Sequence, residues 1–150
     1  MSSKRALYEQ LILEHNKKPR NFGELECATC KADGFNALCG DQFTIYLKLD
    51  GDVISDVRFD GHGCAISKSA ASVMTTVLKG KTRKEAEQLF VKYHEMLTAP
   101  PGTNVETEGL GKLAAFSGVR EFPVRIKCAT LAWHTMMAAL ENKTDTVSTE

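Results

Sequence analysis

The sequence has no surplus of charge of either sign. Its nineteen Lys and Arg residues are matched by nineteen Asp and Glu residues, so the formal net charge at pH 7 is zero. Binding to nucleic acid or to an anionic membrane through overall charge needs a basic surplus. We therefore expect no nucleic acid and no membrane among the partners of this protein, and any charged partner must meet a local patch.

The sequence also lacks a long hydrophobic run. No stretch approaches the roughly 20 apolar residues that a membrane-spanning helix needs. The N-terminal segment MSSKRALYEQLILEHNKKPR carries acidic residues and a helical pattern where a secretory leader has an uninterrupted apolar centre. We therefore expect a cytoplasmic protein.

Internal repeats, low-complexity segments and candidate linkers are absent as well. The 150 residues, of which 43% are hydrophobic, suffice to bury one core and are few for two. We therefore expect a single domain over residues 1–150. The last residues, from about 142 to 150, include few apolar side chains and are expected to form a disordered tail.

The secondary structure that the sequence predicts is that of an α+β fold. Apolar and polar residues alternate from Phe43 to Leu49, which predicts a strand with one buried face, and an Asp-Gly turn leads into a return strand near Phe59. Helical periodicity predicts helices over residues 3–17, 65–78, 82–97 and 123–141, and a short helix within 106–117. Together these predict a small antiparallel β-sheet of about three strands packed against several α-helices.

One segment between the first helix and the first clear strand has no clean pattern. Residues 21–36 are rich in Gly, Asp and Asn, with short strand character around residues 31–35. We expect this segment to be mostly loop.

The five cysteines are an odd number in a chain without an export signal. Because the cytosol keeps thiols reduced, disulfides are the weaker interpretation. Cys39, Cys64 and Cys128 are widely spaced, and each lies at the edge of a predicted element. This placement makes metal binding or thiol chemistry the hypothesis to test, although buried and inert cysteines are also common.

These three cysteines and one acid can form a four-ligand metal site. Cys39 and Asp41 are two residues apart at the start of a predicted strand, so their side chains can share one face. Cys64 begins a predicted helix, where unpaired backbone N–H groups stabilise a thiolate, and Cys128 lies in the first turns of the last helix. Three thiolates and a carboxylate suit tetrahedral zinc or the iron atoms of a small iron–sulfur cluster.

The charge of such a site indicates roles for its neighbours. Three thiolates and a carboxylate around Zn²⁺ sum to about two negative charges, which favours nearby cations. Arg125 and Lys127 are the obvious counter-charges, since they lie three residues and one residue before Cys128. An oxygen ligand among sulfurs is also the point at which a site opens most easily, so Asp41 indicates a site that opens rather than a purely structural one.

The remaining cysteines and histidines leave alternatives open. Cys27 and Cys30 form a Cys-x-x-Cys pair that could be half a zinc knuckle, a redox pair or two unrelated thiols, and we favour unrelated thiols. His62 could be a spare ligand or a proton acceptor, but an exposed loop histidine is the commoner case. The other histidines lie on predicted helices without a partner in the sequence: His15, His94 and His134.

Three segments resemble a known family. They are CGD at Cys39–Asp41, GHGCAISKSAASVM at Gly61–Met74 and FPVRIKCATLAW at Phe122–Trp133. Together they are similar to the NifU N-terminal/IscU family of iron–sulfur cluster assembly proteins, over a range from about Leu7 to Leu140. The chain departs from the usual NPTCGD of that family with NALCGD, and the missing proline bears on loop rigidity more than on ligation.

Two features resemble the SufU branch of this family. Lys127 stands where the scaffold branch, IscU, has a histidine before the third cysteine, and the chain between Cys64 and Cys128 is longer. The resemblance implies a SufU/IscU-like fold with zinc bound by Cys39, Asp41, Cys64 and Cys128. It also implies that Cys39 accepts sulfur from the persulfide of a SufS-type cysteine desulfurase, whose histidine replaces Cys39 on zinc.

The same resemblance implies roles and partners. Cys39, Arg125 and Lys127 are the expected catalytic residues of a sulfurtransferase, with the two cations balancing charge or steadying the transferred sulfur. Downstream partners would be a Suf scaffold or apo iron–sulfur proteins. Two alternatives stay open: a scaffold on which a [2Fe–2S] cluster is assembled, and a zinc-stabilised interaction domain without a reactive thiol.

Overall fold

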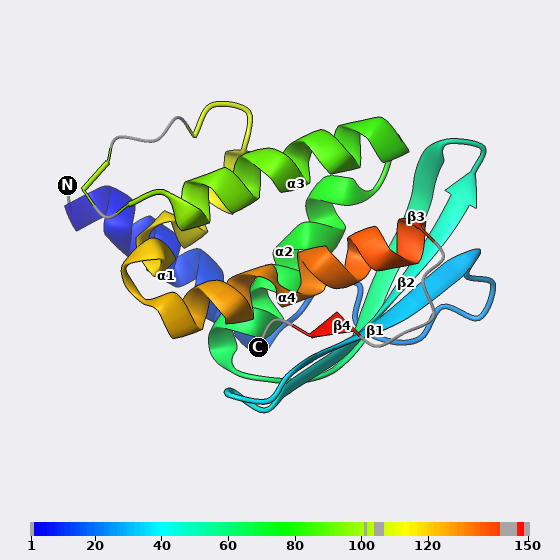
Figure 1. The fold of residues 1–150 in the computed structure, drawn as a ribbon, viewed down its shortest axis with the longest axis horizontal. Coiled ribbons are helices and arrows are strands. Elements are labelled where there is room, and N and C mark those ends of the chain that lie inside the picture. The colour runs from blue at the N-terminus through cyan, green and yellow to red at the C-terminus, as the bar shows by residue number, and fades with distance from the viewer. Residues whose placement is uncertain (1, 101, 104–106, 142–146, 149–150) are drawn as a thin grey trace.

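The computed structural model describes residues 2–100, 102, 103, 107–141, 147 and 148 (Figure 1). The helices are α1 (Ser2–Lys17), α2 (Ala65–Leu78), α3 (Arg83–Thr98), the 3₁₀ helix η1 (Gly111–Glu121) and α4 (Pro123–Leu140). The strands are β1 (Cys30–Asn36), β2 (Asp41–Asp50), β3 (Val53–His62) and β4 (Val147–Ser148). This architecture confirms the α+β fold class that the sequence predicts.

The strands form one sheet in the order β3-β2-β1-β4. Because β1, β2 and β3 pair antiparallel, the expected sheet of about three antiparallel strands is confirmed. β4 adds a short parallel edge, in which Val147 pairs with Gly34 and Ser148 with Phe35. Val147 and Ser148 belong to the expected disordered tail; residues 142–146, 149 and 150 of that tail lie outside the described residues.

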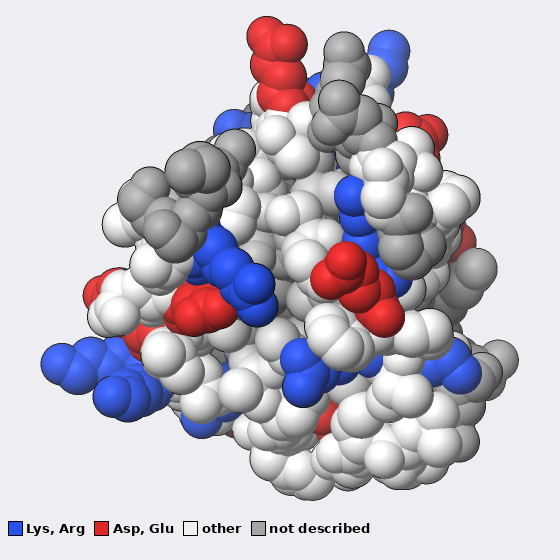
Figure 2. Space-filling view, turned by 90° about the vertical axis from the view of Figure 1, so that its left-hand side faces the viewer, with Lys and Arg blue, Asp and Glu red and all other residues white. Residues whose placement is uncertain are grey.

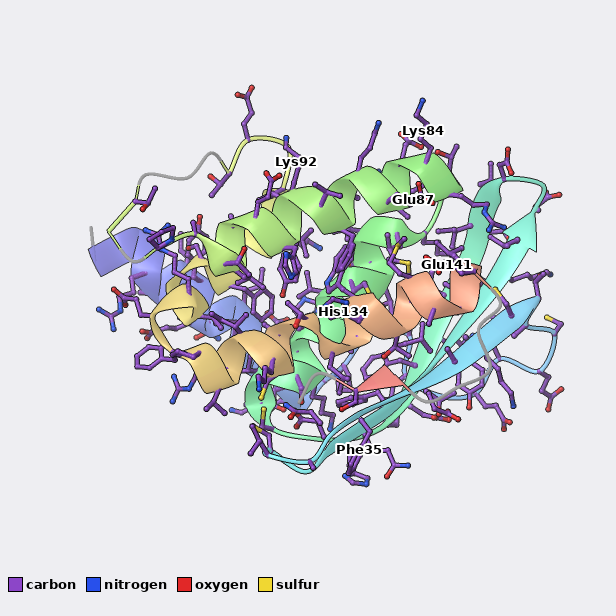
Figure 3. The ribbon with its side chains drawn as sticks, in the orientation of Figure 1. Phe35, Lys84, Glu87, Lys92, His134 and Glu141 are labelled. Carbon is purple, nitrogen blue, oxygen red and sulfur yellow. The ribbon has the colours of Figure 1, made fainter. Side chains whose placement is uncertain are left out.

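The strand character expected around residues 31–35 is confirmed by β1, which is a full strand, so the expected loop is limited to the first part of residues 21–36. Hydrophobic alternation missed this strand because the side that it buries is small or polar and consists of Ala32, Gly34 and Asn36. Phe35 points away from the helices, on the other side of the sheet (Figure 3). Backbone pairing with β2 along its whole length, rather than apolar side chains, defines β1 as a strand.

The helices gather on one face of the sheet, and α4 lies across it (Figure 1). Phe43, Ile45 and Leu47 of β2 are fully buried in one core with Trp133 of α4. Burying each large apolar side chain contributes about 1.5–3 kcal/mol. Since α2 follows β3 directly, this packing brings the first turns of α2 and α4 to the same end of the strands.

β1 and α4 approach each other closely at Gly34. A Cβ added to Gly34 would overlap Thr135 Oγ1 and would lie 3.1 Å from Leu131 Cδ1. Gly34 and Asn36 share the buried side of β1, while Thr135, Leu131 and Cys128 share one side of α4. The close approach at Gly34 therefore brings Asn36 against Cys128.

Within the described residues, no helix is both long enough and apolar enough to cross a membrane. The cytoplasmic location and the single domain over residues 1–150 stay predictions.

Candidate metal centre

Cys39, Asp41 and Cys128 meet at one end of the two central strands, β1 and β2. Cys39 lies on the turn between β1 and β2, Asp41 is the first residue of β2, and Cys128 lies in α4. One ligand atom from each lies within 4.8 Å of the other two. Asp41 and Cys128 are buried and Cys39 is half-buried. The fold thus brings together three of the four ligands that the sequence predicts.

Cys64, the fourth predicted ligand, lies beside this group. It precedes α2 as its N-cap, as predicted, and its Sγ accepts a hydrogen bond from Ser67 N at 3.5 Å. Its backbone N donates to Asp41 Oδ1 at 2.9 Å. Cys64 also lines a cavity of about 640 Å³ together with Cys39 and Cys128. One cavity is therefore lined by all three thiols.

Cys128 is hydrogen-bonded to its neighbouring thiols. Cys128 Sγ donates a hydrogen bond to Cys39 Sγ at 2.9 Å. A hydrogen bond from Cys128 also lowers the pKa of Cys64 to about 6, with help from Ser67. The same pairing with Cys64, together with burial, raises the pKa of Cys128. Cys64 is therefore the more acidic and Cys128 the less acidic of these two thiols, and a bound cation would displace the remaining thiol protons.

Asp41 is held by donors on both of its oxygens. Oδ1 accepts from Cys64 N and from Ser67 Oγ, each at 2.9 Å, and Oδ2 accepts from Asn36 Nδ2 at 3.3 Å. Gly63 makes room for this network, because an added Cβ would lie 2.5 Å from Ser67 Oγ and 2.7 Å from Asp41 Oδ1. The glycine after His62 in the GHGC segment therefore has a packing role at the candidate centre.

Arg125 and Lys127, the two predicted cations, differ in exposure and in their position relative to the thiol cavity. Arg125 is exposed, its guanidinium lies 4.7 Å from the centre of the Phe122 ring, and both residues line the cavity of the three thiols. Lys127 is half-buried and is not among the residues that line this cavity. Their roles as counter-charges or in holding sulfur stay predictions.

Sequence reasoning missed two polar residues of the site, Asn36 and Ser67. Both are buried, and both donate to Asp41. Asn36 belongs to the segment that was expected to be loop, so nothing indicated that it points inward. Ser67 lies three residues after Cys64, at a spacing typical of contacts with a helix N-cap, and that spacing could have found it.

The remaining cysteines and the histidines lie outside the group. Cys27 is exposed, and Cys30 begins β1 at the end opposite Asn36, about 20 Å along a strand of this length. His62 is exposed at the end of β3. The helical histidines have neighbours of their own: His15 Nδ1 lies 2.7 Å from Ser72 Oγ, and the rings of His94 and His134 lie 5.8 Å apart, between α3 and α4.

The surface around the centre is apolar. Leu38, Phe122 and Val124 are large hydrophobic residues with exposed side chains. A hollow of about 730 Å³ between α1, η1 and the start of α4 shares Phe122 and Arg125 with the thiol cavity. Figure 2 shows this side of the molecule, with an uncharged floor between basic and acidic side chains. An apolar surface with a polar rim is typical of a face that another molecule covers.

Comparisons with known proteins agree with this geometry. Residues 7–129 match the family model of the NifU-like N terminal domain. The chain is 40% identical over 130 residues to the zinc-dependent sulfurtransferase SufU of Bacillus subtilis (strain 168), which covers 87% of this chain and 86% of that protein. It is 36% identical over 135 residues to the iron-sulfur cluster assembly scaffold protein IscU of Streptococcus pyogenes serotype M1. That match covers 90% of this chain and 83% of the relative.

A solved structure supports the same relationship. The crystal structure of a protein named as an iron-sulfur cluster assembly scaffold for the SUF system, from Fervidobacterium islandicum AW-1, matches with a TM-score of 0.80 and 37% identity. The match covers 87% of this chain and 94% of that one. Sequence and fold therefore agree, and the chain belongs to the NifU-like N-terminal domain family.

Proposed function

We propose that this chain is a zinc-dependent sulfur acceptor of iron–sulfur cluster biogenesis, which takes persulfide sulfur onto Cys39 from a SufS-type cysteine desulfurase. The observation that carries the proposal is the meeting of Cys39, Asp41 and Cys128 ligand atoms within 4.8 Å, with Cys64 on the wall of the same cavity. The Bacillus subtilis relative, at 40% identity, is named for both zinc and sulfur transfer, which supports the same function here.

The donor set fits zinc. Three sulfurs and one carboxylate oxygen are ligand types that zinc binds in a set of four. Cys39, Asp41, Cys64 and Cys128 would hold the ion. Bound zinc keeps a cysteine deprotonated at neutral pH and lowers its exposure to oxidants. The same donors would be a poor match for Mg²⁺ or Ca²⁺, which prefer oxygen ligands throughout.

Cys39 is the thiol that is best placed to leave the site and react. It is half-buried on a turn, whereas Cys64 caps α2 and Cys128 is buried in α4. A turn moves with less disruption than a helix that packs in the core. Cys39 can therefore swing toward a partner while the other ligands stay in place.

The transfer step conserves atoms and electrons. The Cys39 thiolate attacks the outer sulfur of the cysteine persulfide on the desulfurase, and a new S–S bond forms on Cys39. The S–S bond of the partner breaks, and its electron pair leaves with the cysteine thiolate of the desulfurase. Arg125, exposed at the cavity, supplies a guanidinium for the anionic persulfide, and Lys127 adds positive charge next to Cys128 along α4.

The test follows ³⁵S from labelled free cysteine through the desulfurase to this chain. We expect the wild-type chain to take up label and to stimulate the desulfurase, and we expect Cys39→Ser to do neither. Cys27→Ser is the matched control and should behave as the wild type, because Cys27 is exposed and distant from the centre. Unchanged desulfurase turnover with Cys39→Ser would contradict the proposal.

A second candidate function is a scaffold on which a [2Fe–2S] cluster is assembled and passed to apo-proteins. The same three thiols and carboxylate suit an iron–sulfur cluster, and the Streptococcus pyogenes relative, at 36% identity, is named a scaffold. The metal content of protein purified without oxygen separates the two functions. About one zinc per chain without sulfide favours sulfur transfer to a downstream Suf scaffold or apo iron–sulfur protein, whereas iron and sulfide in equal amounts favour assembly.

A further inference from the structure

Asn36 is a buried amide that contacts two of the candidate ligands. It is the last residue of β1, lies opposite Asp41 in the register of the sheet and has no exposed surface. Its Nδ2 lies 3.3 Å from Asp41 Oδ2 and 3.6 Å from Cys128 Sγ. An ionised carboxylate only accepts hydrogen bonds, so the amide must turn its NH₂ group toward Asp41. Its two N–H groups can then serve both ligands at once.

The other end of this amide is not satisfied. Asn36 Oδ1 is buried and has no hydrogen-bond partner within the described part of the chain. A buried acceptor without a partner destabilises a fold, and an apolar side chain of the same shape would avoid this loss. Packing alone therefore does not explain an asparagine at this position. Buried polar groups normally have hydrogen-bond partners, and residues that depart from this rule are expected at functional sites.

The contacts of Asp41 indicate what the amide does. Oδ1 already accepts from Cys64 N and Ser67 Oγ at 2.9 Å, while Oδ2 has the longer contact to Asn36. Oδ2 is therefore the oxygen with capacity left for a cation, and Asn36 fixes its direction. Because Cys128 comes from α4 and Asp41 from β2, the amide also ties two separate elements together.

We propose that Asn36 is a positioning residue that holds Asp41 Oδ2 and Cys128 Sγ in binding geometry, so that the zinc stays in place while Cys39 is away carrying sulfur. This inference rests on the proposed function, because it concerns the same zinc site. Partners of this kind orient a ligand without touching the metal, and their loss lowers metal affinity about 10–100-fold.

The experiment replaces the amide by an apolar side chain of similar shape, Asn36→Leu, and measures zinc affinity by competition with a chelator. We expect a loss of about 10–100-fold in affinity. Thermal unfolding of the metal-free chain measures the separate effect on folding: the variant removes the unsatisfied Oδ1 but leaves the buried Asp41 Oδ2 without its donor, so we expect a modest fall in melting temperature. A purely structural role would lower the melting temperature and leave zinc affinity unchanged. The smaller Asn36→Ala is measured alongside and should lose zinc affinity as well, so that a folding failure of one variant does not decide the result.

Two further comparisons sharpen the test. Thr76→Val is the control: it removes a half-buried hydroxyl that donates within α2 to Val73 O, twelve residues along the chain from Cys64, and zinc affinity should not change. In a Cys39→Ser background, the remaining ligands should still bind zinc, and Asn36→Leu should remove that binding. Substituting Co²⁺ for Zn²⁺ gives a spectrum that reports how many thiolates bind.

The outcomes separate the two proposals. If both Asn36→Leu and Asn36→Ala kept zinc affinity within twofold of that of their parent chain, in the wild-type and the Cys39→Ser backgrounds, the role of Asn36 alone would be overturned. Absence of zinc binding by the wild-type chain would refute the proposed function itself. Loss of affinity in the Asn36 variants but not in Thr76→Val, with an altered Co²⁺ spectrum, would establish the positioning role.

Discussion

Replacing Gly34 with alanine should push β1 away from α4 and weaken the candidate metal centre without changing any of its ligands. The added Cβ would overlap Thr135 Oγ1 and lie 3.2 Å from Thr135 Cβ and 3.1 Å from Leu131 Cδ1. Gly34 does not have a positive φ, so the alanine is opposed by these contacts and not by its own backbone. The strand must therefore shift, and Asn36 and Asp41 shift with it relative to Cys128.

The magnitude follows from two opposing effects. Overpacking a filled core typically costs about 1–3 kcal/mol. Replacing glycine by alanine recovers about 0.4–1 kcal/mol by restricting the unfolded chain. The net loss in the free energy of unfolding is therefore about 1–2 kcal/mol, which lowers the melting temperature of a chain of this size by roughly 2–8 °C. Zinc affinity should fall by about 10-fold or more, as for other losses of ligand orientation.

The assay combines thermal unfolding of the metal-free chain with zinc competition, in a double-mutant cycle. Thr135→Ala removes the overlapping Oγ1, so Gly34→Ala should cost much less stability in that background, and zinc affinity should recover. Gly118→Ala is the control, because an added Cβ there has nothing within 4 Å, and it should be nearly neutral. If Gly34→Ala were equally destabilising with and without Thr135→Ala, the close approach would not be the cause.

Two further predictions concern the Asp41 network and the α1–α2 contact. Gly63→Ala should lower zinc affinity more than stability, because the added Cβ would press on Ser67 Oγ and Asp41 Oδ1; zinc competition against thermal unfolding checks this, and an equal loss of both would argue against it. Burial, and then the charge of Arg20, lowers the pKa of His15 below 6.5, so below about pH 6.5 the unfolded chain binds a proton that the folded chain resists. The free energy of unfolding should therefore fall as the pH drops below 6.5, and His15→Asn should flatten that fall in urea titrations; an unchanged slope would contradict it.

The sequence alone predicted the elements whose patterns are local. The β2–β3 hairpin follows from alternation and an Asp-Gly turn, and α3 begins with a capping box at Thr82 and Glu85 that can be recognised from spacing. Cys64 was expected at a helix start, and it is the N-cap of α2. These features depend on residues a few positions apart, so their physical cause is contained in a short stretch of chain.

The sequence indicated only short strand character within β1, because the buried side of this strand carries Ala32, Gly34 and Asn36, which give no hydrophobic alternation. The strand exists because β2 offers backbone partners along its whole length. The same omission hid Asn36, whose inward direction follows only from the strand geometry of β1. Ser67 was missed as a donor to Asp41 because its acceptor lies 26 residues away in the chain.

The sequence by itself determined which side chains are available for chemistry: three cysteines and an acid at the ends of elements, in an order similar to that of a known family. Only the tertiary structure decided that they meet. Cys128 reaches Cys39 across 89 residues because α4 packs on β1 at a glycine that leaves no room for a side chain. The sequence specifies which side chains are present, but the packing of helices and strands determines which distant residues come close together.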